Sequence, residues 1–499
     1  MLSEYRQRFT DYHTELYQED YLLRSGRKRD RETEHIRREY SDLFEPSAIS
    51  ELRAKLQDTP QSRATERTGI QRLIAFAVDG ALHSQTNEIS AEIEKFESSS
   101  RIDWHGRSVP LLETASLLSN ERNADLRRDL FARRADLIAS AQDLRAERFE
   151  KSMAAAKALG YENLLALRIE SNGINYQGLA ERTKKILSQT ESGYVNALSS
   201  LSLRETGVAL DDATAADLGF LQSFKRFDHF FPVERMFGIY RELFAAFGFN
   251  VDKQTNLSID SEPHPGKQPQ AFCSPIRVPD DIKLVVNLTG GQSNYREFLR
   301  ETGHAQLYAW TSRNIYPEFR VGGDSAILAA WGSLLENLVH DESWLMSTFG
   351  FVENSEFRHA LAVFRLMSQR RAAAMLDYEI ELFTGGLTAG AGKRYAELMT
   401  DAARVIIDET EHLNSPAGAF YSADYLRASA FESQMREYLK TRFGQRWWAS
   451  RKAGETLIDM WNTGQRYKVE ELAAMIGLGE LDFDWMISES LDWLKGRTR

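Results

Sequence analysis

The residues of this 499-residue chain that are best placed to do chemistry follow a glycine pair, Gly290-Gly291, and include Arg300, Glu301 and His304. Positions 300 and 304 are four residues apart, so their side chains share one face of a helix. Zinc sites of the HExxH type use this spacing for two histidine ligands, with a glutamate between them that activates water. Here the pattern is RExxH, so Glu301 and His304 hold the general-base and second-ligand positions and an arginine holds the first.

The elements around these residues can be predicted from residue types. The run DIKLVVNLT, residues 281–289, is rich in β-branched residues and predicts a strand. A helix is expected to begin near Ser293 or Asn294, which are both good N-caps, and to run through Trp310. After a linker that contains Pro317, helix is expected again from about Ser325.

Helix is also expected through the first 200 residues, above all in the Ala-, Leu-, Arg- and Glu-rich stretch from Glu113 to Gly160, where Gly160 is predicted as a helix C-cap. The Pro-rich stretch 250–279 predicts loop. The chain is therefore predicted to be mainly α, with one small β-sheet in its second half. We divide it into an N-terminal helical part, residues 1–170, and a second part, residues 171–499, that carries the RExxH helix.

The chain resembles the thimet oligopeptidase and oligoendopeptidase F family of zinc metallopeptidases. That family has a strand, a Gly-Gly turn and then a helix that reads roughly FLHExGHAxH. The present sequence matches the strand and the turn, the lead-in Tyr295, Phe298 and Leu299, and the triplet Gly303-His304-Ala305. The resemblance is best over residues 272–480. It implies a zincin-like oligopeptidase fold with a deep central cleft and a short sheet at the edge of the cleft.

The resemblance also implies roles for individual residues. The family carries a third zinc ligand, a glutamate, on a second helix, and aligning that helix on Glu336 places Ala329 at the ligand position. The catalytic residues implied are Glu301, Tyr425, Tyr421 and His412. Since family members bind extended peptide along the strand at the cleft, Lys283 to Thr289 is expected to pair with a peptide backbone.

A catalytic zinc needs three protein ligands and an open position. The matched positions supply only His304, because the guanidinium of Arg300 stays protonated and has no lone pair to donate, and Ala329 has no donor atom. No cofactor is therefore expected. Zinc is expected only if the site is rewired, and the residues considered for that are His304, Asp324, Glu336, His340, Asp341 and His359. His340 to Glu342 is predicted as an exposed polar patch, and His359 as a surface residue.

Two interpretations of Arg300 remain open. Its guanidinium can fill part of the vacated zinc position and pair with Glu336 or Asp324, which would balance a Glu301 carboxylate that has lost its metal. Alternatively, it points to solvent in a widened cleft.

Composition excludes several classes of function. The formal net charge of −11 disfavours nucleic-acid binding. One cysteine allows no disulfide within the chain, and the N-terminus has no apolar signal-peptide core, so a cytoplasmic protein is expected. No apolar run is long enough to cross a membrane, and the GxSxG, Walker and GxGxxG patterns that would indicate other enzymes do not occur.

Three functions follow from these observations. The first is a pseudopeptidase that binds a peptide or an unfolded segment in the cleft and does not hydrolyse it. The second is an active metallopeptidase with a rewired metal site. The third is an enzyme of another class that reuses the cleft.

Overall fold

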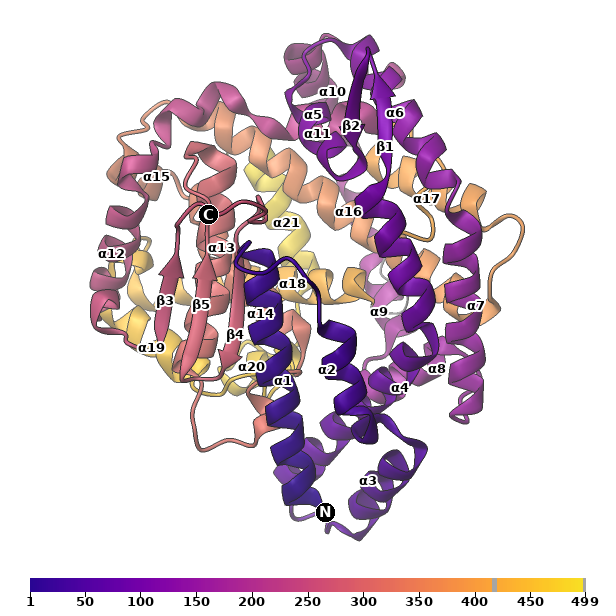
Figure 1. Cartoon of the computed structure of the whole chain (residues 1–499). Helices are drawn as coiled ribbons and strands as arrows, with labels where there is room; N and C mark the ends of the chain where they lie inside the picture. The colour runs from indigo at the N-terminus through magenta and orange to yellow at the C-terminus, as the bar shows by residue number, and fades with distance from the viewer. Residues whose placement is uncertain (415–419, 497–499) are drawn as a thin grey trace.

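A computed structural model describes residues 1–414 and 420–496, and helices account for most of them, which confirms the mainly α fold (Figure 1). The helices before the central sheet are α1 (Leu2–Arg24), α2 (Thr33–Glu39), α3 (Pro46–Asp58), α4 (Ala64–Ser99), α5 (Thr114–Asn120), α6 (Ala124–Ala139), α7 (Gln142–Ala158), α8 (Leu164–Asn172), α9 (Tyr176–Thr183), α10 (Lys185–Thr206), α11 (Ala215–Ser223) and α12 (Met236–Ala246). Those after it are α13 (Gly291–Trp310), α14 (Ser325–Glu336), α15 (Glu342–Phe349), α16 (Ser355–Gly385), α17 (Ala391–Ala403), α18 (Tyr421–Phe443), α19 (Arg451–Trp461), α20 (Val469–Met475) and α21 (Phe483–Leu494).

The central sheet has three strands, β3 (Leu257–Asp260), β4 (Phe272–Arg277) and β5 (Asp281–Val285), in the order β3-β5-β4. Helices α1 and α13 both pack against it. The predicted strand is present but ends at residue 285. The expectation that Lys283 pairs with a bound peptide is wrong, because β5 lies in the centre and pairs with β3 on one side and with β4 on the other.

A second sheet, the hairpin of β1 (Arg101–Trp104) and β2 (Arg107–Pro110), was not predicted. Its two-residue turn is His105-Gly106, with φ angles of 50° and 73°, as a tight hairpin requires. Ile102, Trp104 and Val109 point to one side and belong to a small separate hydrophobic cluster. The sheet predicted in the second half of the chain is present, and this hairpin in the first half is an addition to it.

Two helix boundaries differ from prediction. The stretch from 113 to 160 forms three helices, because Asn123 caps α6 by accepting a hydrogen bond from the Asp125 N–H at 2.9 Å. Helix α13 begins at Gly291, and the Asn294 side chain instead accepts from the N–H groups of Thr289 and Gly290. Gly160 follows the end of α7 with a φ of +91°, as predicted for a C-cap glycine.

Helices α13 and α14 approach each other closely through two glycines. A Cβ atom added at Gly303 would lie 2.8 Å from the carbonyl carbon of Trp331 and 2.9 Å from the Cα of Gly332, closer than real Cβ atoms approach. Only glycine fits such a crossing. The close approach brings the face of α13 that carries Arg300 and His304 against α14.

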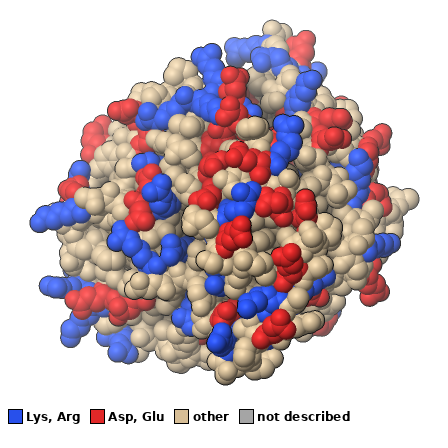
Figure 2. Space-filling view, turned by 60° about the horizontal axis from the view of Figure 1, so that its bottom comes forward, with Lys and Arg blue, Asp and Glu red and all other residues tan. Residues whose placement is uncertain are grey.

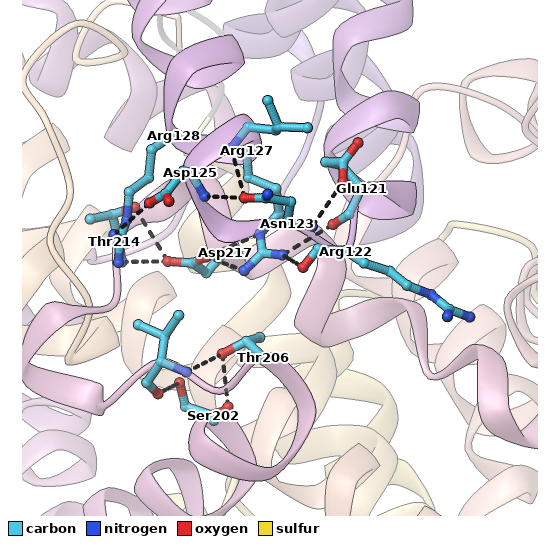
Figure 3. Close-up of polar contacts among 12 residues, drawn as sticks. Glu121, Arg122, Asn123, Asp125, Arg127, Arg128, Ser202, Thr206, Thr214 and Asp217 are labelled. Atoms are coloured by element: carbon cyan, nitrogen blue, oxygen red, sulfur yellow. Dashed lines mark hydrogen bonds and ion pairs between the residues drawn. The ribbon is translucent and has the colours of Figure 1, made fainter.

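A buried ion pair joins α6 to α11 (Figure 3). Arg127 Nε and Nη2 donate to Asp217 Oδ1 at 3.0 and 2.6 Å, and Arg127 Nη1 donates to the backbone carbonyls of Glu121 and Arg122. The other carboxylate oxygen of Asp217 accepts from the Thr214 N–H at 3.1 Å. Both charged side chains have 0% exposure, and each of the three guanidinium nitrogens of Arg127 donates at least one of these bonds.

One main hydrophobic cluster runs from Tyr5 to Leu494, so helices from both ends of the chain share a core. On the face shown in Figure 2, basic and acidic side chains are interspersed. Among the described residues, no helix combines the length and apolar character that a membrane span requires.

Candidate functional site

A cavity of about 650 Å³ lies among α13, α14, α16 and α18. A smaller cavity of about 370 Å³ shares Ser325 with it and is bordered by α4 and α8, so the hollow continues toward the N-terminal helices. The larger cavity brings together six of the residues predicted from the sequence, namely Arg300, Glu301, His304, Ala329, Tyr421 and Tyr425.

Glu301 and His304 form a hydrogen-bonded pair one turn apart on α13. The Nδ1 atom of His304 lies 3.0 Å from Glu301 Oε2. Burial alone would raise the pKa of the Glu301 carboxyl, but His304 and Arg300 outweigh it and hold that pKa below its usual range. The carboxylate is therefore charged at neutral pH, so His304 donates through Nδ1–H.

Arg300 pairs with two carboxylates in the cavity. Its Nε donates to Glu301 Oε1 at 3.3 Å, and its Nη1 lies 3.5 Å from Glu336 Oε2. Glu336 has a second and shorter partner, because Arg296 Nη2 donates to its Oε1 at 2.8 Å. Of the two interpretations of Arg300, the structure matches the one in which the guanidinium turns to a cavity carboxylate, and the partner is Glu336.

The other nitrogen of His304, Nε2, is buried and has no hydrogen-bond partner in the part of the chain that the structure describes. It faces the backbone of α14, since a Cβ atom at Gly332 would collide with it and would lie 2.9 Å from His304 Cδ2. Because position 332 is a glycine, the imidazole of His304 has space to pack against the backbone of α14.

The residues at the zinc position do not fit the metal that the resemblance implies. His304 Nε2 carries a lone pair that could bind a metal, but the neighbouring positions supply a guanidinium and the methyl group of Ala329. A tetrahedral zinc site needs three nitrogen, sulfur or oxygen ligands from the protein. Across residues 1–414 and 420–496, no three His, Cys, Asp or Glu side chains are grouped to hold a metal ion. The metal content of the protein stays a prediction.

Three of the residues considered for a rewired site, Asp324, Asp341 and His359, are engaged elsewhere. Asp324 accepts hydrogen bonds from both terminal nitrogens of Arg427 at 2.9 and 2.7 Å. Asp341 caps α15 through the Trp344 N–H. His359 is half-buried rather than on the surface, and its Nδ1 lies 3.0 Å from the Leu494 carbonyl oxygen.

His340, predicted to be exposed, is 7% exposed and lines the cavity, so that prediction is wrong. It ends the short 3-10 helix Asn337–His340, and its ring stacks on Trp493 of α21 with the centroids 4.4 Å apart. Burial first, and then four arginines, keep the pKa of this imidazole well below its ordinary value. His340 is buried rather than exposed because of tertiary packing, since the Trp493 ring that covers it comes from the far end of the chain.

The predicted C-terminal site residues separate into two groups. Tyr421 and Tyr425 begin α18 and line the cavity, Tyr421 at 61% exposure and Tyr425 half-buried. Burial raises the pKa of both hydroxyls, which therefore stay protonated and can donate hydrogen bonds. His412 does not line the cavity; its Nδ1 lies 2.8 Å from the Glu409 carbonyl oxygen, beside Gly392 of α17. Residues 415–419, which connect it toward α18, lie outside the described residues.

Sequence reasoning missed the wall of the cavity that α16 supplies. Arg365 of α16 donates to Glu432 of α18 at 2.9 Å, and both side chains line the cavity. Glu432 also accepts from Arg436, which in turn donates to Glu489 of α21. Buried arginines and glutamates on otherwise apolar helices were the available signal, but pairing across three helices is not visible in a single sequence.

Comparison with solved structures gives nearly full-length matches. PZ peptidase A with inhibitor 2 has a TM-score of 0.72 and 15% identity, covering 98% of this chain and 91% of that chain. A putative oligoendopeptidase F from Bacillus anthracis str. Ames has a TM-score of 0.68 and 16% identity, covering 98% of this chain and 90% of that chain. No family model matches the sequence, and comparison with curated proteins gives no significant match. The resemblance inferred from the sequence is confirmed at the level of the fold.

Proposed function

We propose that this chain is a pseudopeptidase of the oligopeptidase fold, which binds a peptide or an unfolded segment in the cavity without zinc-dependent hydrolysis. The observation that carries the proposal is the contact of Arg300 with Glu301 and Glu336. A guanidinium supplies positive charge beside the carboxylate that would otherwise activate water, and it cannot act as a ligand.

The cavity supports peptide binding by its size and polarity. A volume of about 650 Å³ lies within the range of ligand pockets. Leu361 and Phe364 supply apolar wall, while Tyr421 and Tyr425 supply hydroxyl donors for peptide carbonyl groups. With Lys283 inside the sheet, recognition depends on these side chains rather than on pairing with β5.

The first test measures metal content by elemental analysis, together with cleavage of a mixed quenched-fluorescent peptide library in added zinc. We expect less than about a tenth of an equivalent of zinc and no cleavage, because one histidine binds zinc weakly. Near one equivalent with chelator-sensitive cleavage would replace this proposal with an active metallopeptidase. A non-peptide molecule that copurifies in the cavity would instead favour an enzyme of another class.

The second test restores the ligands. In Arg300→His/Ala329→Glu, the two new side chains would join His304 as a three-ligand set on helices already in place. We expect this variant to bind about one equivalent of zinc. Arg300→Gln/Ala329→Gln is the matched control, since it removes the guanidinium and adds no histidine or carboxylate. Equal zinc binding by both variants would contradict the assigned positions.

A further inference from the structure

The wall of the cavity formed by α16 and α18 contains an arginine, Arg365, of which one terminal nitrogen is paired and the other is not. The side chain of Arg365 is 8% exposed, and its Nη2 donates to Glu432 Oε2 at 2.9 Å. Its Nη1 is buried and has no hydrogen-bond partner among residues 1–414 and 420–496. Guanidinium N–H groups that are buried in proteins normally meet an acceptor, so this nitrogen is available to an acceptor from outside the described residues.

The surrounding ion pairs do not need this nitrogen. Arg436 donates two hydrogen bonds to Glu432, at 2.9 and 3.2 Å, and two to Glu489, at 2.5 and 3.0 Å. Both carboxylates therefore have a cationic partner without Arg365 Nη1. The guanidinium of Arg365 also lies over the ring of Trp493, 4.6 Å from its centroid, which restrains its orientation. Arg365 is therefore held in place by contacts that leave one of its donor groups free.

Several arginines lie around this wall, and each is paired with a carboxylate. His340 lines the same cavity, and after burial the largest influences on its pKa are Arg365, Arg296, Arg436 and Arg358, all of which lower it. His340 is neutral at physiological pH, so it adds a hydrogen-bonding ring without adding charge.

We propose that Arg365 binds a carboxylate group of the peptide in the cavity, with Nη1 donating a charge-assisted hydrogen bond to it. This deepens the proposed function and rests on it. A carboxylate fits better than a dianion, because Glu301, Glu336 and Glu432 also line the cavity and would repel a second negative charge. The carboxylate comes either from the peptide C-terminus or from an aspartate or glutamate side chain, and the experiment separates these sources.

The test uses the full chain and four synthetic libraries of eight-residue peptides. Two libraries contain Asp and Glu and two lack them, and each kind is made once with a free C-terminal carboxylate and once with a C-terminal amide. The peptides are identified by mass. Peptides retained with the protein after ultrafiltration are counted. We expect peptides with the preferred carboxylate to be enriched about tenfold, the size of one hydrogen bond to a charged group. Enrichment that follows the free acid assigns the C-terminus, and enrichment that follows Asp and Glu assigns a side chain.

Variants tie the preference to Arg365. Arg365→Met should reduce the enrichment to about one, whereas Arg365→Lys, which keeps the charge, should retain part of it. Arg358→Met is the matched control on the same helix; Arg358 pairs with Glu342 and does not line the cavity, so the enrichment should persist. Melting temperatures of all variants identify any that fail to fold.

Each outcome has a distinct meaning. Equal retention of all four libraries by the unmodified protein overturns the role of Arg365 and leaves peptide binding in place. Retention of none overturns the proposed function and this inference together. An enrichment that survives in folded Arg365→Met shows that another group binds the carboxylate, and also overturns the inference.

Discussion

Two charged clusters of this molecule use arginine in opposite ways. In the contact between α6 and α11, Arg127 and Asp217 have 0% exposure and are linked by short hydrogen bonds (Figure 3). In the cavity, Arg300 is 38% exposed and touches Glu301 and Glu336 at 3.3 and 3.5 Å. In the first cluster each guanidinium nitrogen of Arg127 has an acceptor within the chain, whereas the second cluster lies in a cavity that leaves room for another partner.

The difference separates structural ion pairs from those that are available for binding. Removing one partner of a fully buried pair strands a charge, so such a pair resists change. A half-exposed pair with long contacts contributes little to stability and can exchange partners. Charged residues in the cavity are thus better candidates for ligand contacts than those between α6 and α11, although both clusters consist of arginine and carboxylate.

The largest expected effect comes from Asp217→Ala. Arg127 would keep its two backbone carbonyl acceptors but lose its counter-charge in a fully buried place. We expect the free energy of unfolding, measured by urea titration, to fall by about 3–5 kcal/mol. The double variant Arg127→Met/Asp217→Leu should recover most of the loss, because it removes both charges. A loss below about 1 kcal/mol in the single variant would mean that this buried ion pair is not more important for stability than the ion pairs in the cavity.

Gly303→Ala tests whether the cavity wall is held by backbone packing rather than by ion pairs. The new methyl group would meet the backbone of Trp331 and Gly332, which cannot rotate away. We expect a loss of about 1–3 kcal/mol in the same titration. Gly238→Ala, in helix α12 with no atom within 4 Å of the added methyl group, is the control and should be neutral or stabilising by up to about 1 kcal/mol. An equal loss of unfolding free energy in both variants would mean that the close approach of α13 and α14 is not the cause of the destabilisation.

Glu379 extends the comparison to a buried carboxyl that has a hydroxyl partner and no cation. It accepts a hydrogen bond from Ser422, and burial, with a smaller contribution from Asp424, raises its pKa to about 7. The folded protein therefore holds a proton that the unfolded chain releases at lower pH. This stabilisation is complete below the pKa of the unfolded chain and is lost as pH rises through about 7.

Glu379→Gln removes this titration. The difference in free energy of unfolding, variant minus unmodified protein, should rise by roughly 1–3 kcal/mol from pH 5 to pH 8. Urea titrations of both proteins at the two pH values provide the measurement. Asp424, whose pKa is raised to about 6 first by burial and then by Asp324, contributes its own slope to both proteins, and this slope cancels only in part because the charges of Asp424 and Glu379 interact. Parallel pH profiles would show that Glu379 is not protonated in the fold.

The smallest expected effect comes from Arg300→Ala. Glu301 keeps His304 and Glu336 keeps Arg296, so no carboxylate loses its last partner. We expect the free energy of unfolding to change by less than about 1 kcal/mol. A loss as large as that of Asp217→Ala would make Arg300 a structural residue and would weaken the proposal that it stands in for the charge of a metal.

Residue types along the chain allowed the helical class, the strand at 281–285 and the face shared by Arg300 and His304 to be predicted, because these depend on local spacing. The hairpin at 101–110 was missed, although alternation of Ile102 and Trp104 around a His-Gly turn was a usable signal. Arg365 and His340 could not be assigned to the cavity. Their places depend on how α16 and α21 pack, and a single sequence does not encode that in any local pattern.

The balance of guanidinium and carboxylate groups around the cavity affects how fast a ligand arrives. Three arginines and three glutamates line it, in a chain whose formal net charge is −11. At long range an acidic peptide therefore meets a repulsive field and no steering attraction. Salt shortens the reach of that field to about 10 Å at 0.1 M. Association should become faster as ionic strength rises, while dissociation, which on our proposal depends on the contact with buried Arg365, should change little.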